Sequence, residues 1–91
     1  MIIMALNCGS SSVKYQLFDW EKKEVVAKGM VERVIVGDSF IVHEVPGREP
    51  YRLDEDCPDH RAAIDLIIRT LTDSENGVMK SVAEIDRKSV V

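Results

Sequence analysis

The chain opens with an uninterrupted apolar segment, residues 2–6, placed directly before a turn-like segment of small polar residues. A short strand with no polar residue at alternate positions is typical of a strand covered on both faces of its sheet. Beyond the turn the pattern changes to alternation, and one alternating set consists of Val13, Tyr15 and Leu17. Because only residues 7–11 separate the two segments, the sequence predicts an antiparallel hairpin.

The next segments predict the remaining elements of one small sheet. Residues 24–36 and 39–45 alternate and predict a third and a fourth strand, whereas residues 46–57 show little periodicity and predict a loop. Apolar residues recur at helical spacing within residues 59–72, with acidic residues near the start, which predicts one helix. The expected fold class is α+β or α/β, an antiparallel meander of about four strands followed by one helix.

The third strand carries its own packing signal. Its more apolar set predicts a core face of Val25, Ala27 and Val31, and Gly29 marks a bulge or a close backbone approach. One helix covers only one face of a sheet, whereas the first strand has the composition of a strand covered on both. We therefore expect a complete protein to need more chain than these residues.

Composition excludes several classes of function. The 91 residues are 45% apolar and 31% charged, which is typical of one soluble globular domain. A net charge of −4 without a basic face argues against nucleic-acid binding. Cys8 and Cys57 lie far apart and predict free thiols in a reducing, cytoplasmic protein. No apolar run approaches the roughly 20 residues of a membrane span, and the apolar start is too short for a signal peptide.

The segment "NCGSSSVKYQ" offers a second interpretation beyond a structural Gly/Ser turn. If the second strand starts at Ser10, then Ser10, Ser12 and Lys14 project to one side, and two hydroxyls with one ammonium suit phosphoryl oxygens. Gly9 would let backbone N–H groups approach the same anion. Asn7 offers an amide oxygen that would orient a magnesium-bound water. The segment lacks the Gly-Lys-Ser/Thr and the helix of a P-loop.

The segment "MALNCGSSSVKYQLFD" resembles the N-terminal signature of the acetokinase family, the acetate kinases of the actin/hexokinase/Hsp70-like superfamily. The later segments "GMVERV", "DHRAAIDLIIRTL" and "GVMKSVAEID" are similar to the end of the third strand, the first helix and the following linker of that family. The resemblance runs to about Asp86. It implies a partial actin-like (ribonuclease H-like) domain.

The same resemblance implies roles for the residues of the turn. Asn7 is expected to serve Mg²⁺ and Lys14 to bind ATP. Two serines, Ser10 and Ser12, are expected to line the phosphate site, and Gly9 with Ser11 to shape the turn. The implied reaction is reversible phosphoryl transfer between ATP and acetate, which gives acetyl phosphate and ADP.

Members of the family are several times longer than this chain, so residues 1–91 are expected to form the N-terminal part of such a protein. The sequence "EIDRKSVV" departs from the family pattern, and Arg87 and Lys88 receive no role. The catalytic groups, the adenosine pocket and the C-terminal domain through which members form homodimers have no counterpart here, so we expect the isolated chain to be inactive. The alternatives are a fragment of a propionate or butyrate kinase and a small non-catalytic β-rich binding module.

The remaining polar candidates favour structural roles. His43 and His60 have no catalytic partner at a suitable spacing and are expected to be structural or solvent-exposed. The acidic residues of segment 54–59 lack the spacing of a calcium loop, so a solvated, helix-capping role is expected for them.

Overall fold

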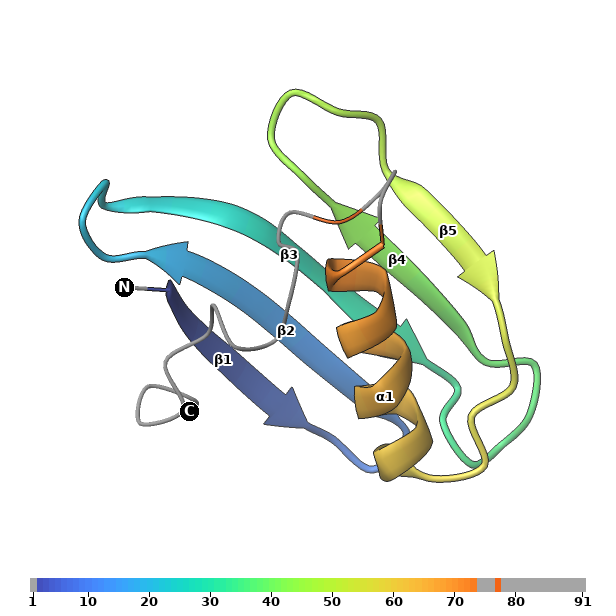
Figure 1. Ribbon diagram of the computed structural model, residues 1–91. Coiled ribbons are helices and arrows are strands. Elements are labelled where there is room, and N and C mark those ends of the chain that lie inside the picture. Colours follow the sequence, from blue (N-terminus) through green and yellow to red (C-terminus); the bar gives the residue numbers. More distant parts are fainter. Residues whose placement is uncertain (1, 74–76, 78–91) are drawn as a thin grey trace.

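A computed structural model describes residues 2–73 and residue 77 of the chain. Five strands form one antiparallel sheet in chain order, and one helix follows them (Figure 1). The elements are β1 (Ile2–Cys8), β2 (Ser12–Asp19), β3 (Glu24–Glu32), β4 (Phe40–Glu44), β5 (Tyr51–Asp54) and α1 (His60–Leu71). Within the described residues the expected meander and helix are thereby confirmed, with one strand more than predicted.

The additional strand β5 lies within the segment predicted to be a loop. It pairs with β4 through partners such as Ile41 and Leu53. Its alternation covers only four residues, with Tyr51 and Leu53 half-buried and the two charged residues between and after them exposed. Four residues flanked by prolines and charged residues are too few to reveal an alternation with a period of two. The prediction of a loop was therefore wrong here.

Strand β3 also ends earlier than predicted, at Glu32 instead of residue 36. Arg33 and Ile35 adopt positive φ angles of 59° and 77°, which break the extended backbone. The turn is held by Ser39, whose hydroxyl donates to the Arg33 carbonyl over 2.8 Å and accepts the Cys57 N–H over 3.0 Å. Val34 is buried, although continued alternation from the buried Val31 would turn it to the other face, so its burial depends on this turn.

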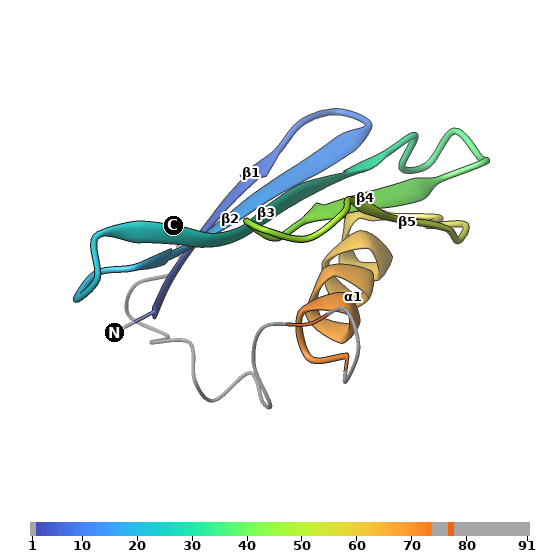
Figure 2. The same cartoon turned by 90° about the horizontal axis from the view of Figure 1, so that it is seen from above.

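Helix α1 begins and ends where the sequence predicts. Asp59 is its N-cap and accepts a hydrogen bond from the Ala62 N–H over 2.8 Å, and Thr72 is its C-cap. The helix lies across one face of the sheet (Figure 2). Its buried residues are Ala63, Leu66, Ile67, Thr70 and Leu71. Among the described residues, no helix or strand lies on the opposite face of the sheet, which is called the open face below.

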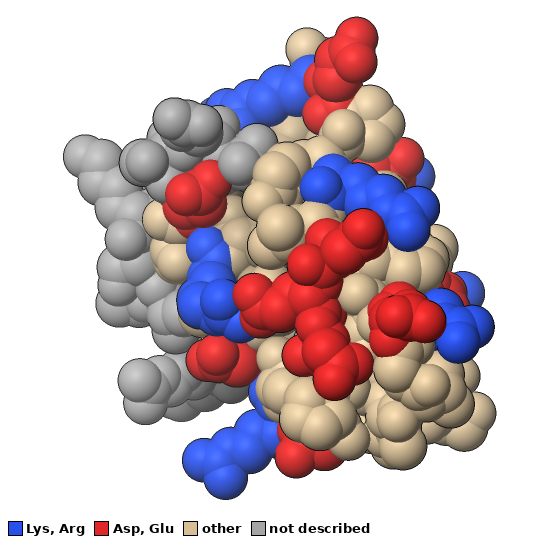
Figure 3. Space-filling view, turned by 90° about the vertical axis from the view of Figure 1, so that its right-hand side faces the viewer, with Lys and Arg blue, Asp and Glu red and all other residues tan. Residues whose placement is uncertain are grey.

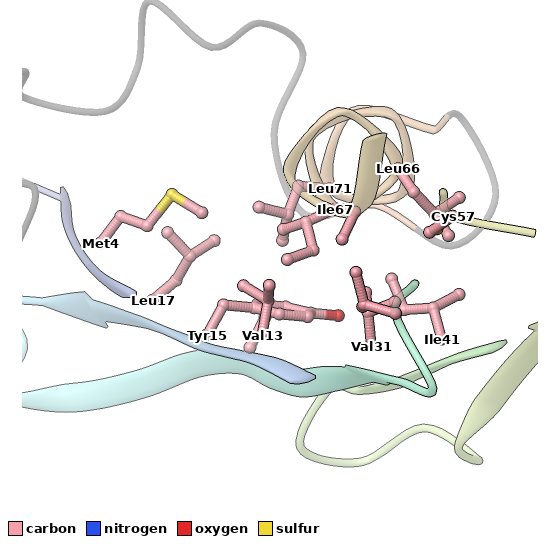
Figure 4. Close-up of a cluster of buried hydrophobic side chains, with 13 residues drawn as sticks. Met4, Val13, Tyr15, Leu17, Val31, Ile41, Cys57, Leu66, Ile67 and Leu71 are labelled. Atoms are coloured by element: carbon pink, nitrogen blue, oxygen red, sulfur yellow. The ribbon is translucent and has the colours of Figure 1, made fainter. Parts of the chain in front are cut away.

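The core is formed where α1 meets the inner faces of four strands (Figure 4). Leu66, Ile67 and Leu71 of the helix point toward side chains of β1, β2, β3 and β4. The sheet residues of this cluster include Met4, Val13, Tyr15, Leu17, Ala27, Val31 and Ile41. All of them are at most 4% exposed, so the alternating sets predicted for β2 and for most of β3 do face the core.

The predicted core position of Val25 was wrong. A β-bulge between Leu17 and Phe18 shifts the register, so that Val25 lies opposite Phe18 and Val26 has no partner on β2. As a result Val26 packs against the core, while Val25 lines a hollow on the other face of the sheet. One extra residue in one strand reverses the faces of the residues beyond it, and alternation alone does not reveal it.

Gly29 marks a close approach, one of the two roles expected for it. It lies opposite Tyr15 on β2 and His43 on β4. The Tyr15 hydroxyl lies 2.7 Å from Nδ1 of His43, and the two rings stack with centroids 5.9 Å apart. A Cβ at position 29 would overlap the Tyr15 ring and the Val42 carbonyl. Burial, together with the negative Glu44, raises the pKa of Tyr15, which therefore keeps its proton at neutral pH.

We predict that Gly29→Ala lowers the free energy of unfolding by about 1–3 kcal/mol, because the new methyl group displaces the Tyr15 ring or the β4 backbone. Urea unfolding followed by circular dichroism measures the change. Lys28→Ala, at the exposed neighbouring position, is the matched control and should stay within about 0.5 kcal/mol. Equal effects of the two substitutions would contradict the packing argument.

The open face and the edge strand β1 have a common consequence. Strand β1 is an edge of the sheet and carries no charged residue, whereas the opposite edge, β5, carries Arg52 and Asp54. Half-buried apolar side chains, including Phe18, Met30 and Val42, alternate with the core residues and therefore lie on the open face. Uncharged edges and apolar faces are sites of association between chains.

We therefore predict that the isolated chain self-associates at high concentration, as sedimentation velocity will show. Ile3→Lys should reduce the association, because a charge on the edge strand opposes strand pairing. A single monomeric boundary for the unmodified chain at high concentration would rule this prediction out.

Candidate functional site

The hairpin of β1 and β2 places Asn7 directly opposite Lys14. Both residues are exposed, and both belong to the alternating sets that face away from α1. They line an open hollow of about 230 Å³ together with Ala5, Leu6, Tyr15 and Gln16. An amide and an ammonium group that share one hollow can contact one anion and the metal ion that accompanies it. The two residues with the most specific predicted roles are therefore adjacent in space.

The three serines occupy different positions. Ser12 is the first residue of β2, is half-buried, and lies on the same face of that strand as Lys14. Ser10 lies in the turn before β2 begins and is exposed, so it does not share the strand alternation that we expected from a start at Ser10. Ser11 accepts a hydrogen bond at its carbonyl from the Val34 N–H over 2.9 Å, which ties the turn to the segment after β3. Phosphate contacts of Ser10 and Ser12 stay a prediction.

Gly9 does not adopt a left-handed backbone, and only a movable side chain limits the space beside it. Its φ is not among the positive values of the chain, but a Cβ would stand 2.9 Å from Oγ of Ser12. Its N–H donates to the Ser12 carbonyl over 2.8 Å. This N–H group is therefore already bonded within the turn, and the approach of other backbone N–H groups to an anion stays a prediction.

The structure adds His60 to the surroundings of the turn. Nε2 of His60 lies 2.6 Å from the Gly9 carbonyl oxygen, across 51 positions of sequence. His60 is the first residue of α1, so the start of the helix lies beside the turn between β1 and β2. Sequence reasoning expected a structural or exposed residue here but did not place it beside the turn. The available signal was its position directly after the helix cap, Asp59.

Three carboxylates of the acidic segment before α1 take part in capping and ion pairs. Asp59 caps the helix, Glu55 pairs with Arg69, and Asp54 lies 3.2 Å from Arg52. Figure 3 shows the side of the molecule that carries β5, where acidic side chains gather between basic ones. No group of three metal-ligating side chains occurs within residues 2–73 and 77. The capping role expected for this segment is confirmed for Asp59.

A larger hollow of about 460 Å³ lies on the same open face, toward the loop between β4 and β5. Its charged side chains are already engaged: Lys28 lies 3.9 Å from Glu44, and Arg48 donates to the Gly77 carbonyl over 3.2 Å. Gln16 lines both hollows. The smaller hollow beside Lys14 therefore has the better chemistry for a phosphate, despite its size.

Solved structures define the class of protein to which this fold belongs. The crystal structure of Porphyromonas gingivalis acetate kinase superposes with a TM-score of 0.89 at 41% identity, covering 93% of this chain and 21% of that one. A propionate kinase from Francisella tularensis shares the fold, with a TM-score of 0.75 at 20% identity. The fold is the N-terminal fifth of an actin-like kinase, as the resemblance implied.

The sequence comparisons identify the family. The model of the acetokinase family matches residues 2–89, and the chain belongs to that family. It is 84% identical over 85 residues to the acetate kinase of Trichlorobacter lovleyi and 76% identical over 85 residues to that of Geobacter sulfurreducens. The chain spans about a fifth of the length of these relatives, 20% in each case, and 93% of the chain is matched.

The two cysteines are free thiols, as expected, but their surroundings differ. Cys8 is exposed beside the turn, whereas Cys57 is 1% exposed. Burial, with a further contribution from the negative Glu55, raises the pKa of the Cys57 thiol. The thiolate is the reactive form, so Cys57 is protected both by burial and by protonation.

We predict that iodoacetamide modifies Cys8 rapidly in the folded chain and Cys57 on the order of 100-fold more slowly, since Cys57 reacts only after local unfolding. Peptide mass spectrometry over time measures both rates. Cys8→Ser should remove the fast reaction alone, and urea should abolish the difference in the unsubstituted chain. Similar rates for both thiols without denaturant would contradict the described packing.

Proposed function

We propose that this chain is the N-terminal part of an acetate kinase, which transfers a phosphoryl group reversibly between ATP and acetate to give ADP and acetyl phosphate. The observation that carries the proposal is the pairing of Asn7 and Lys14 across the β1–β2 hairpin, with both side chains lining one hollow. We choose acetate over propionate or butyrate because the relatives at 76–84% identity are acetate kinases.

The proposed work of the hairpin is to bind and orient the phosphates of ATP. The Lys14 ammonium compensates phosphoryl charge, and the hydroxyls of Ser12 and Ser10 donate hydrogen bonds to phosphoryl oxygens. Ser11 and Gly9 keep the turn in shape through their backbone hydrogen bonds. Phosphoryl transfer depends mostly on positioning and charge compensation, and the hairpin supplies both on one side of the transferred group.

Magnesium fits the same donor set. The Asn7 side chain is neutral and carries one oxygen acceptor, which suits a water in the outer shell of Mg²⁺. The metal would reduce the negative charge of the phosphates that Lys14 faces. Asp54, Glu55 and Asp59 are committed to ion pairs and helix capping, so they are not the proposed ligands.

The wider context is part of the proposal. Residues 1–91 would form the N-terminal part of the first domain, and a full-length protein would be a cytoplasmic homodimer that joins through its C-terminal domain. No helix in the described part of the chain is both long and apolar enough to cross a membrane. The isolated chain is expected to lack turnover, because the groups that complete the reaction would belong to the rest of the protein.

The test uses a full-length chimera in which the 85 matched residues of this chain replace the corresponding segment of the Trichlorobacter lovleyi acetate kinase. Lys14→Ala should lower kcat/KM for ATP by about 10- to 150-fold, the effect of losing one hydrogen bond to a charged group. The kcat/KM of Lys14→Arg should lie between that of the unsubstituted chimera and that of Lys14→Ala, since arginine keeps the positive charge but not the shape of the ammonium group. The hydroxamate assay with ATP, Mg²⁺ and acetate measures these rates.

Lys28→Ala is the matched control, because Lys28 is also an exposed lysine on the open face of the sheet. It should leave kcat/KM for ATP unchanged, and the isolated 91-residue chain provides the baseline. A Lys14→Ala chimera with full activity would refute the phosphate role of the hairpin. If the isolated chain turns over at the rate of the chimera, the proposal that activity requires the rest of the protein is refuted.

A further inference from the structure

The β1–β2 turn is held by hydrogen bonds to two other parts of the fold. Within the turn, the Gly9 N–H donates to the Ser12 carbonyl, and from outside it the Val34 N–H donates to Ser11. The remaining contact comes from a side chain: Nε2 of His60 lies 2.6 Å from the Gly9 carbonyl oxygen. A carbonyl oxygen only accepts, so Nε2 of His60 carries the hydrogen and donates it.

His60 is itself held in place by the helix that it begins. The Asp59 cap fixes the first turn of α1 through the Ala62 N–H. The helix then packs Ala63 and Ile67 into the core, where both are fully buried. Because α1 is packed on the sheet, the backbone of His60 is held beside the turn, and the glycine that its ring contacts is the residue type with the greatest backbone freedom.

We propose that His60 is a positioning residue for nucleotide binding: its hydrogen bond to the Gly9 carbonyl holds the turn in the conformation that presents Ser10 and Ser12 to phosphate. The inference rests on the proposed function of the hairpin and adds a residue of α1 to that site. His60 faces the backbone of the turn, so it acts through the turn and does not itself contact the ligand.

A positioning role differs from a general structural role in its kinetic signature. Loss of the donor leaves the core of α1 and the sheet intact but lets the Gly9 peptide rotate, so binding of ATP must then order it again. The expected change is a rise of about 3- to 10-fold in KM for ATP, the effect of one neutral hydrogen bond. KM for acetate and kcat should change less than twofold, because the turn is proposed to contact phosphate alone.

The experiment compares four substitutions in the full-length chimera. His60→Ala and His60→Phe both remove the donor, and the phenylalanine keeps a ring of similar shape should the alanine variant fold poorly. His60→Gln keeps an N–H donor at a similar distance and should restore KM for ATP to within about twofold of the unsubstituted value. Arg61→Ala, at the next and exposed position of α1, is the matched control and should have no effect.

The outcomes separate this inference from the proposed function. An unchanged KM for ATP in His60→Phe, or no recovery in His60→Gln, overturns the positioning role. Equal losses for ATP and acetate, accompanied by a lower melting temperature, also overturn it and leave His60 as a packing residue. If Lys14→Ala raises KM for ATP while the His60 variants do not, only this inference fails; if Lys14→Ala has no effect, the proposed function of the hairpin fails as well.

Discussion

Burial of the inner face of β2 beneath α1 sets the orientation of the side chains on both faces of this strand. Val13, Tyr15 and Leu17 are at most 3% exposed, and all three face the helix. Because successive side chains of a strand point to opposite faces, fixing these three fixes the direction of every residue between them. Lys14 is thereby held on the open face opposite Asn7. A hydrophobic contact on one face of the sheet thus determines where the polar groups of the other face stand.

The parts of the fold that were predictable follow from local patterns. Alternation over β2 and helical spacing over α1 each extend for eight residues or more, and both elements occur where they were expected. The predictions were wrong where the local pattern of apolar residues does not determine the path of the backbone. The bulge opposite Phe18 moved Val25 out of the core, and the positive φ of Arg33 ended β3 early. Strand β5 was too short to show a period.

The sequence predicted which residues form the candidate site, but not the contacts that hold the turn of the site in place. The resemblance to the acetokinase family named Asn7 and Lys14, and the register of the hairpin brings them together. His60 lies 51 positions from Gly9, and no periodicity or motif relates residues at that distance. Contacts of this kind depend on how the helix lies on the sheet, which is a property of the whole core. Sequence patterns therefore identify the side chains of a site more readily than the tertiary contacts that hold those side chains in place.

The Gly9 N–H is already bonded to the Ser12 carbonyl, and this bears on the thermodynamics of the anion binding that we propose for this turn. Backbone that is internally satisfied before a ligand arrives does not have to be immobilised again when it binds. The entropic cost of capture then falls on rotatable side chains, above all on the four-carbon stem of Lys14, at about 0.5–1.5 kcal/mol for each such group. Under the proposed function, a hairpin built in this way would combine a rigid frame with a mobile cation that can follow a phosphoryl oxygen as it moves.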